Sequence, residues 1–297
     1  MHENQVALDD ALAERLVHLQ FAQWAEVPVT PLVTTATTSY IYRVGGAHTA
    51  RFPMQLADAE IVRAELERER AAMDAFADAS PVPAPRQVAV GEPAFGYSMP
   101  WSVQTWIDGI VATPSSSSDA LAEDLADLIA RLREVPTHGE RFAGGGRGGV
   151  IASHDEWVGY CLDESVGMLP VDRLRRAWTT LRSARGASPD VMSHKDLIPA
   201  NLLVAEGRLA GVLDTGGFGP ADPALDLVSG WHVLDAGPRS ILRDRLAVDD
   251  DEWRRGAAWA LQQALGLVWY YVETNPVMSA LGRSTIERLL AAPELDL

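Results

Sequence analysis

The sequence predicts an α+β protein in which a small antiparallel sheet with one packed helix precedes a mostly helical part that contains a β-hairpin. Three observations support this class. Strand-like runs dominate the first 105 residues, the composition breaks at Asp108-Gly109 and the following TPSSSS stretch, and apolar residues at helical spacing dominate after residue 226. We therefore expect two lobes, 1–105 and 106–297.

The first lobe is expected to place short strands on either side of one long helix. A shorter helix near 6–24 precedes them. The charged segment 57–77 carries Leu66, Met73 and Phe76 at helical spacing, so these three side chains should be buried. Runs of β-branched, aromatic and alternating apolar residues predict strands within 27–33, 40–44, 48–54, 80–90 and 100–107.

The second lobe is expected to be mostly helical. Ser118 or Asp119 can cap a helix that continues to about Val135. The glycine-rich segment AGGGRGG, 143–149, is expected to form a loop. Further helices are expected at 154–168, at 171–184 and after residue 226.

Composition excludes several classes of partner. The formal net charge is −16 and the chain has no Lys/Arg cluster, whereas nucleic-acid binding requires a basic face. No apolar run is long enough to span a membrane, and the acidic N-terminal segment is unlike a secretory signal. The single cysteine, Cys161, excludes an internal disulfide and a cysteine-rich metal site. The sequence predicts a cytoplasmic protein and leaves its oligomeric state open.

The stretch SHKDLIPANLL, 193–203, gathers polar side chains before a predicted hairpin. Two short apolar runs, LLV and LAGVL, flank a turn that contains Glu206-Gly207. The first strand leaves Asn201 and the second returns to Asp214, while Asp196 lies in the loop just before the hairpin. Because a hairpin brings its open ends together, we expect these three residues to lie near one another.

Two carboxylates and an amide at such a position suit phosphoryl transfer. Mg²⁺ prefers carboxylate and carbonyl oxygens together with substrate phosphates. A further carboxylate can orient an acceptor hydroxyl and take its proton. The spacing His194-x-Asp196-x₄-Asn201, followed by Asp214-x-Gly216, is close to a kinase catalytic loop with its metal-binding motif.

The stretch HKDLIPANLLV…GRLAGVLDTGGFGPADPALDLV resembles the aminoglycoside phosphotransferase family, whose small-molecule kinases have a protein-kinase-like fold and include relatives that act on choline and macrolides. This resemblance implies that Asp196 is the catalytic base or the residue that orients the acceptor hydroxyl, and that Asn201 and Asp214 hold Mg²⁺. It also implies that His194 and Asp226 brace the loop.

Two residues of this site, Lys195 and Thr215, depart from the family pattern. A third residue, Asp222, has two possible roles. Lys195 stands where glycine is usual, and its cation beside the base can assist the transferring phosphate or favour a particular acceptor. Thr215 stands where an aromatic residue is usual, while the metal-binding aspartate itself is retained. Asp222 either braces the loop or approaches the site.

The resemblance also implies a nucleotide site for ATP or GTP in the first lobe. The TTATTS segment, which ends at Ser39, would cover the phosphates with its backbone N–H groups, or else it is a plain hairpin turn. Arg51 would contact the phosphates and pair with Glu69, with Glu65 as the alternative partner. Both Arg51 and the helix glutamates can instead be surface residues. Backbone groups from Gln104 to Trp106 would recognise the base.

The expected function is transfer of the γ-phosphoryl group of ATP or GTP to a hydroxyl of a small molecule. An antibiotic of the aminoglycoside or macrolide type is the first acceptor class, which would make the protein a resistance enzyme. The AGGGRGG segment would then be a mobile loop near the acceptor. Two alternatives stay open. One is a metabolic kinase for an amino alcohol or a sugar, and the other is a kinase-like module that binds nucleotide without turnover.

Overall fold

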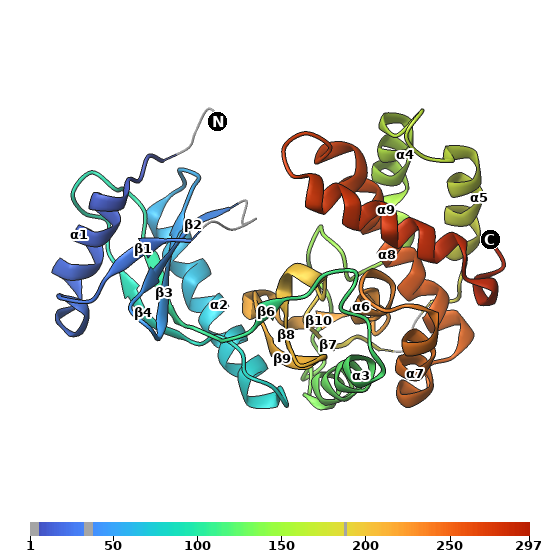
Figure 1. Ribbon diagram of the computed structural model, residues 1–297, viewed down its shortest axis with the longest axis horizontal. Helices are drawn as coiled ribbons and strands as arrows, with labels where there is room; N and C mark the ends of the chain where they lie inside the picture. Colours follow the sequence, from blue (N-terminus) through green and yellow to red (C-terminus); the bar gives the residue numbers. More distant parts are fainter. Residues whose placement is uncertain (1–5, 33–37, 187–188) are drawn as a thin grey trace. The chain divides into compact units, whose positions relative to one another are not determined.

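The computed structural model describes residues 6–32, 38–186 and 189–297, and it divides into two compact units (Figure 1). The first unit consists of the described residues of Met1–Asp78, Pro83–Asp108 and Leu213–Gly217. The second consists of the described residues of Ala79–Val82, Gly109–Val212 and Phe218–Leu297. The segment with Asp214 therefore packs with the first unit, although it follows the hairpin of the second in sequence.

The first unit is built on a five-stranded sheet in the order β1-β2-β3-β5-β4, with every neighbouring pair antiparallel. Its strands are β1 (Val29–Pro31), β2 (Ser39–Val44), β3 (His48–Pro53), β4 (Gln87–Gly91) and β5 (Trp101–Thr105). The predicted small antiparallel sheet is confirmed. Residues 34–37 of the predicted TTATTS turn lie outside the described residues.

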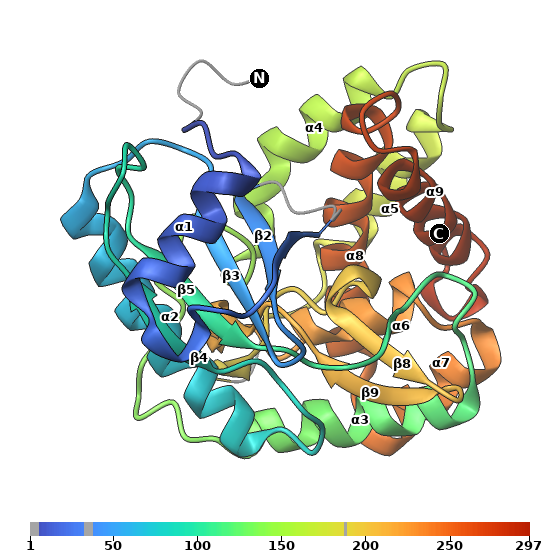
Figure 2. The same cartoon turned by 60° about the vertical axis from the view of Figure 1, so that its left-hand side comes forward.

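Two helices pack with this sheet. Helix α1 (Asp10–Gln20) covers one face (Figure 2). It ends earlier than predicted because Phe21 adopts an extended backbone, after which Ala22–Trp24 form a short 3₁₀ turn. Helix α2 (Ala59–Ala79) buries the three predicted residues, Leu66, Met73 and Phe76.

Strand β3 divides its side chains between the core and the opposite face. Ala50 and Phe52 are fully buried in the core with the apolar face of α1. The Phe52 ring stacks on Trp101 at a centroid distance of 4.5 Å and meets Tyr97 edge-on at 5.6 Å. Because successive side chains of a strand point to opposite faces, Arg51 points away from this core.

The second unit is mostly helical, as predicted. Its helices are α3 (Asp119–Glu134), α4 (Asp155–Glu164), α5 (Val171–Leu181), α6 (Val228–His232), α7 (Ala236–Leu246), α8 (Asp250–Tyr270) and α9 (Pro276–Leu290). Ser118 caps α3, since its side chain accepts a hydrogen bond from the N–H of Leu121. None of the helices among the described residues is long and apolar enough to cross a membrane.

Short strands complete the second unit. They are β6 (Ile110–Val111), β7 (Val191–Ser193), β8 (Leu202–Ala205), β9 (Arg208–Val212) and β10 (Gly219–Ala221). The predicted hairpin is formed by β8 and β9, with Ala205 opposite Arg208. The two turn residues, Glu206 and Gly207, both have positive φ, of 51° and 75°. This is the turn whose twist matches that of the paired strands.

The aromatic core of the first unit should dominate its stability. Replacing Phe52 with alanine removes a fully buried ring and its contacts with Trp101 and Tyr97, so we expect a loss of about 3–5 kcal/mol in unfolding free energy. Urea unfolding followed by tryptophan fluorescence would measure it. Leu56→Ala is the control, because Leu56 is exposed and should change stability by less than about 0.5 kcal/mol. Equal effects of the two substitutions would contradict the assignment of this core.

Candidate active site

The loop that carries His194, Lys195 and Asp196 is fixed by one buried carboxylate. Asp226 is only 3% exposed. Its Oδ1 accepts hydrogen bonds from Ser193 Oγ at 2.8 Å and from the N–H of Lys195 at 3.0 Å, and its Oδ2 accepts from the N–H of His194 at 3.0 Å. Both oxygens are thus used to hold the backbone of the loop. The bracing contact expected of Asp226 is present.

His194 supports the same loop from inside the second unit. The side chain is buried, and its Nδ1 accepts a hydrogen bond from the N–H of Asp196 at 3.2 Å. Since this contact fixes the backbone of Asp196, it also limits the directions in which the aspartate side chain can point.

The carboxylate of Asp196 accepts hydrogen bonds from three side chains, two of them from distant parts of the chain. Oδ1 accepts from Nη2 of Arg147 at 2.8 Å and from Nε2 of Gln263 at 2.6 Å. Oδ2 accepts from Nδ2 of Asn201 at 3.1 Å. A carboxylate has about four acceptor positions, so Oδ2 retains capacity for one more donor such as a hydroxyl. About a third of the Asp196 side chain is exposed, which leaves it accessible.

A hydrogen-bond chain continues from Gln263 into α9. Because a carboxylate only accepts, Gln263 must direct its NH₂ group to Asp196 and its Oε1 to His232, 3.0 Å away. Burial lowers the pKa of His232 to about 4, so the ring is neutral and carries its proton on Nε2. Its Nδ1 lies 2.8 Å from the Thr285 hydroxyl, whose single proton is shared between this ring nitrogen and Leu281 O, 2.9 Å away. The chain from His232 through Gln263 to Asp196 has a single consistent direction.

Lys195 adopts a backbone conformation that usually belongs to glycine. Its φ is +72°, in the left-handed region. The N–H of Lys195 donates to Ser193 Oγ and Asp226, which holds the residue in this conformation. Burial lowers the pKa of the ammonium group, and Nζ lies 6.0 Å from the ring centroid of Phe142. For a lysine, this backbone conformation costs about 1–2 kcal/mol, which a glycine would avoid.

A second group of predicted residues lines a cavity of about 300 Å³ in the first unit. Ser39, Arg51, Glu69 and Asp214 all contribute to its wall. Nη2 of Arg51 lies 3.7 Å from Oδ1 of Asp214. Gly216 allows this arrangement, since a Cβ at that position would lie 3.1 Å from Cγ of Glu69.

Glu69 experiences opposing influences in this cavity. Its burial raises the pKa of the carboxyl group, the nearby Arg51 cation lowers it, and the charge of Asp214 raises it again. The Arg51 guanidinium therefore stands between two carboxylates. A bound polyanion would place further negative charge beside the same cation.

Gln104 and Trp106 lie elsewhere in the first unit. Gln104 is buried on β5, opposite Thr49 and Gln87 in the sheet. The N–H of Trp106 donates to Ala47 O at 2.8 Å, and the Arg43 guanidinium covers its ring at 3.7 Å. Neither Gln104 nor Trp106 is among the described residues that line the 300 Å³ cavity.

The donor atoms at the two predicted metal-binding positions suit a hard cation. Asn201 uses its NH₂ group to donate to the backbone and side chain of Asp196, which leaves its carbonyl oxygen as a ligand atom. The Asp214 side chain is 56% exposed. Oxygen ligands of this kind fit Mg²⁺. Within 6–32, 38–186 and 189–297, three or more His, Cys, Asp or Glu side chains are nowhere grouped for metal binding, so water and phosphate would supply the other ligands.

A family model described as the phosphotransferase enzyme family, APH, matches residues 33–259. The chain belongs to this phosphotransferase family. The match covers about three quarters of the chain and includes both groups of predicted site residues. A search of curated proteins found no match to the phosphotransferase.

Solved structures with a similar fold include two ligand complexes and one apoenzyme. The GDP and kanamycin complex of APH(2")-IIia has 17% identity and a TM-score of 0.69, with 94% of this chain and 98% of that chain covered. Macrolide 2'-phosphotransferase MphH from Brachybacterium faecium has 17% identity and a TM-score of 0.58, with 90% and 97% covered. The streptomycin-ATP-APH(2")-IIa ternary complex has 16% identity and a TM-score of 0.56, with 98% and 99% covered. These likenesses confirm the predicted protein-kinase-like fold.

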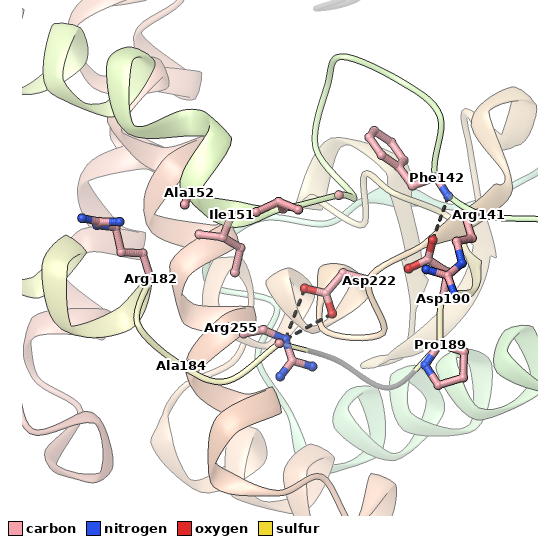
Figure 3. A pocket seen from close by; sticks show the side chains of 13 residues that line it. Arg141, Phe142, Ile151, Ala152, Arg182, Ala184, Pro189, Asp190, Asp222 and Arg255 are labelled. Atoms are coloured by element: carbon pink, nitrogen blue, oxygen red, sulfur yellow. Dashed lines mark hydrogen bonds and ion pairs between the residues drawn. The ribbon is translucent and has the colours of Figure 1, made fainter.

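The phosphotransferase has another cavity, of about 600 Å³, in its second unit (Figure 3). Asp222 and Arg255 meet on its wall, with Arg255 Nε 3.3 Å from each carboxylate oxygen. Asp222 also accepts from the indole N–H of Trp259 at 3.0 Å. Asp222 is therefore linked to α8 through Arg255 and Trp259.

Sequence reasoning did not identify the partners of Asp196 on the helices. Gln263 and His232 lie on α8 and α6, where nothing in the local pattern separates them from other buried residues. Arg147 lies in the AGGGRGG loop, which was recognised as a loop without a role for this arginine. The available sequence signal for Arg147 is that it is the single arginine within a glycine-rich segment.

The buried His232 should make the phosphotransferase less stable in mild acid. Its folded-state pKa of about 4 lies below the ordinary value of 6.5, so the unfolded chain binds the proton first and stability falls as the pH falls through this window. The full effect is about 3 kcal/mol. Urea unfolding of the wild type and His232→Gln between pH 7 and pH 4 would measure it, and the variant should lose this component.

The control for that experiment is His138→Asn. His138 is exposed, and asparagine tolerates its positive φ of 53°. This substitution should leave the pH dependence of the wild type unchanged. A pH dependence shared by the wild type and His232→Gln would contradict the neutral, buried state of His232.

Proposed function

We propose that this phosphotransferase moves the γ-phosphoryl group of ATP or GTP to a hydroxyl of a small molecule, with Asp196 as the base. The observation that carries the proposal is the Asp196 carboxylate, which three donors orient within a loop pinned by Asp226. The acceptor hydroxyl would donate to the remaining acceptor position on Oδ2. Its proton passes to Asp196 as its oxygen bonds to the γ-phosphorus, and the nucleoside diphosphate leaves.

The proposed nucleotide site lies in the first unit, which corresponds to the predicted lobe 1–105. Arg51 would bind the phosphates, with Glu69 holding the guanidinium in place and Ser39 at the edge of the same cavity. Groups from Gln104 to Trp106 would recognise the base. Since the N–H of Trp106 already donates to Ala47 O, base recognition would use carbonyl oxygens or later N–H groups of this segment.

Mg²⁺ is the proposed cofactor. Asn201 and Asp214 would hold it through oxygen atoms, and the ion would neutralise the charge of the transferred phosphate. The chain's own contribution is to keep the Asn201 amide oriented, which its two bonds to Asp196 accomplish.

The lobe 106–297 would bind the acceptor. Solved structures with this fold include complexes with kanamycin and streptomycin and a macrolide phosphotransferase, which support testing antibiotics and a resistance role first. Lys195, beside the proposed base, stands where the family pattern usually has glycine. Its ammonium would assist the transferring phosphate.

Removal of the base tests the proposal directly. Asp196→Asn keeps the shape of the side chain but cannot take a proton, so acceptor-dependent turnover should fall by about 10²–10⁴ while nucleotide affinity is kept. A coupled nucleotide-consumption assay with Mg²⁺ and either ATP or GTP would measure turnover over a panel of hydroxylated acceptors. Asp172→Asn, an exposed aspartate on α5, is the control. Undiminished turnover in Asp196→Asn would remove Asp196 from the mechanism.

Two substitutions test the backbone strain of Lys195 and its charge separately. Lys195→Gly removes the strain of φ +72°, while Lys195→Gln keeps a long side chain without the cation. If the ammonium contributes, both variants should lose turnover by about tenfold or more, the loss of a single charge-assisted contact. Thermal unfolding should show Lys195→Gly at least as stable as Lys195→Gln. Turnover equal to wild type in both variants would exclude a catalytic role.

A further inference from the structure

The AGGGRGG loop, residues 143–149, follows a defined path that places one arginine next to Asp196. At its start, the N–H of Phe142 donates to Asp190 Oδ2 at 2.7 Å (Figure 3). Near its end, Gly148 O accepts from the N–H of Asp222 at 2.7 Å. Between these anchors the loop closes on the Phe142 ring, since a Cβ on Gly148 or Gly149 would lie 2.8 Å from ring carbons. The glycines therefore permit close packing that fixes the path of the loop.

The arginine on this loop, Arg147, has more hydrogen-bonding capacity than its contacts use. Its Nη2 donates to Asp196 Oδ1, and a third of its side chain is exposed. Its Nε is buried and has no hydrogen-bond partner in the part of the chain that the structure describes. A guanidinium offers five donors in a planar fork that matches a carboxylate or phosphate. Arg147 can thus hold an oxyanion beside the base.

The Arg147 guanidinium is the group that favours such an anion. It pairs with Asp196, while the other neighbouring cation, Lys195, feels the charge of the buried Asp226 carboxylate. The buried Asp222 is paired with Arg255. Of these cations, Arg147 combines partial exposure with donor capacity that its contacts do not use. An anionic group placed against it would gain a charge-assisted hydrogen bond that a cationic group cannot make.

We infer that Arg147 binds an anionic group of the acceptor, so that the acceptor is a hydroxylated compound that carries a carboxylate or a phosphate. This inference rests on the proposed function and specifies its substrate class. Arg147 would hold the anionic group while the acceptor hydroxyl meets Oδ2 of Asp196. The pair with Asp196 would keep the guanidinium in position before the acceptor arrives.

The first test is binding of simple anions to the intact chain. Arginine Nε–H signals would be followed by NMR during titration with acetate and, separately, with inorganic phosphate. The Arg147 signal is identified by its loss in Arg147→Gln. We expect a saturable shift of this signal, retained in the control Arg141→Gln, which changes an exposed arginine just before the same loop. The absence of a saturable shift with both anions would overturn the inference. The two titrations also distinguish a carboxylate site from a phosphate site.

The second test is turnover of acceptors that differ in charge. Gluconate, glycerate and glucose 6-phosphate would be compared with neutral glucose and with kanamycin and streptomycin. Arg147→Gln should raise KM for an anionic acceptor by about 10- to 100-fold, the loss of a charge-assisted hydrogen bond, with a smaller change in kcat. Arg147→Lys should restore part of the loss, and Arg141→Gln should resemble wild type.

Outcomes of the two tests separate the inference from the proposed function. Turnover of kanamycin or streptomycin with a kcat/KM that Arg147→Gln leaves unchanged would overturn the inference and leave the kinase function standing. Lack of turnover with every acceptor would count against the proposed function, and the anion titrations would then decide the inference alone.

Discussion

The second unit of this phosphotransferase depends on the buried carboxylate of Asp226. Three donors of the loop, the Ser193 hydroxyl and the N–H groups of His194 and Lys195, converge on its two oxygens. These bonds compensate the burial of a charge that would otherwise be costly. They also hold Lys195 in a left-handed conformation, which sets the direction in which the chain continues to Asp196. Asp196, the proposed base, is therefore oriented by backbone geometry before any side-chain contact is considered.

Side chains from distant segments complete the environment of Asp196. His232 and Gln263 form a hydrogen-bond chain to Asp196, and its direction follows from the neutral state of His232 and the acceptor-only chemistry of a carboxylate. Arg147 donates to the other acceptor position of Oδ1 from a loop that packs around Phe142. The proposed catalysis is thereby linked to stability, because the same buried polar groups that need partners also fix the Asp196 carboxylate.

Much of the architecture could be predicted because its signals are local. The Glu206-Gly207 turn between two apolar runs predicts the hairpin, and Ser118 predicts the start of α3. Arg147 and Gln263 could not be predicted as partners of Asp196, nor His232 as the partner of Gln263, since their meeting depends on the packing of α6, α8 and a loop. The helix predicted to continue to residue 24 ends at Gln20, where an extended Phe21 interrupts a continuous apolar pattern. Local periodicity reports which face is buried, while tertiary packing decides which polar groups meet.

The most direct test of the account is to follow the phosphoryl group itself. Wild-type protein would be incubated with Mg²⁺, γ-³²P-labelled ATP or GTP and the acceptor panel, and the products would be separated by chromatography. The account predicts label on an acceptor, at a phosphoester formed with its hydroxyl, together with an equal amount of nucleoside diphosphate. Label found only in inorganic phosphate, or retained entirely in the nucleotide under conditions where nucleotide binds, would contradict it.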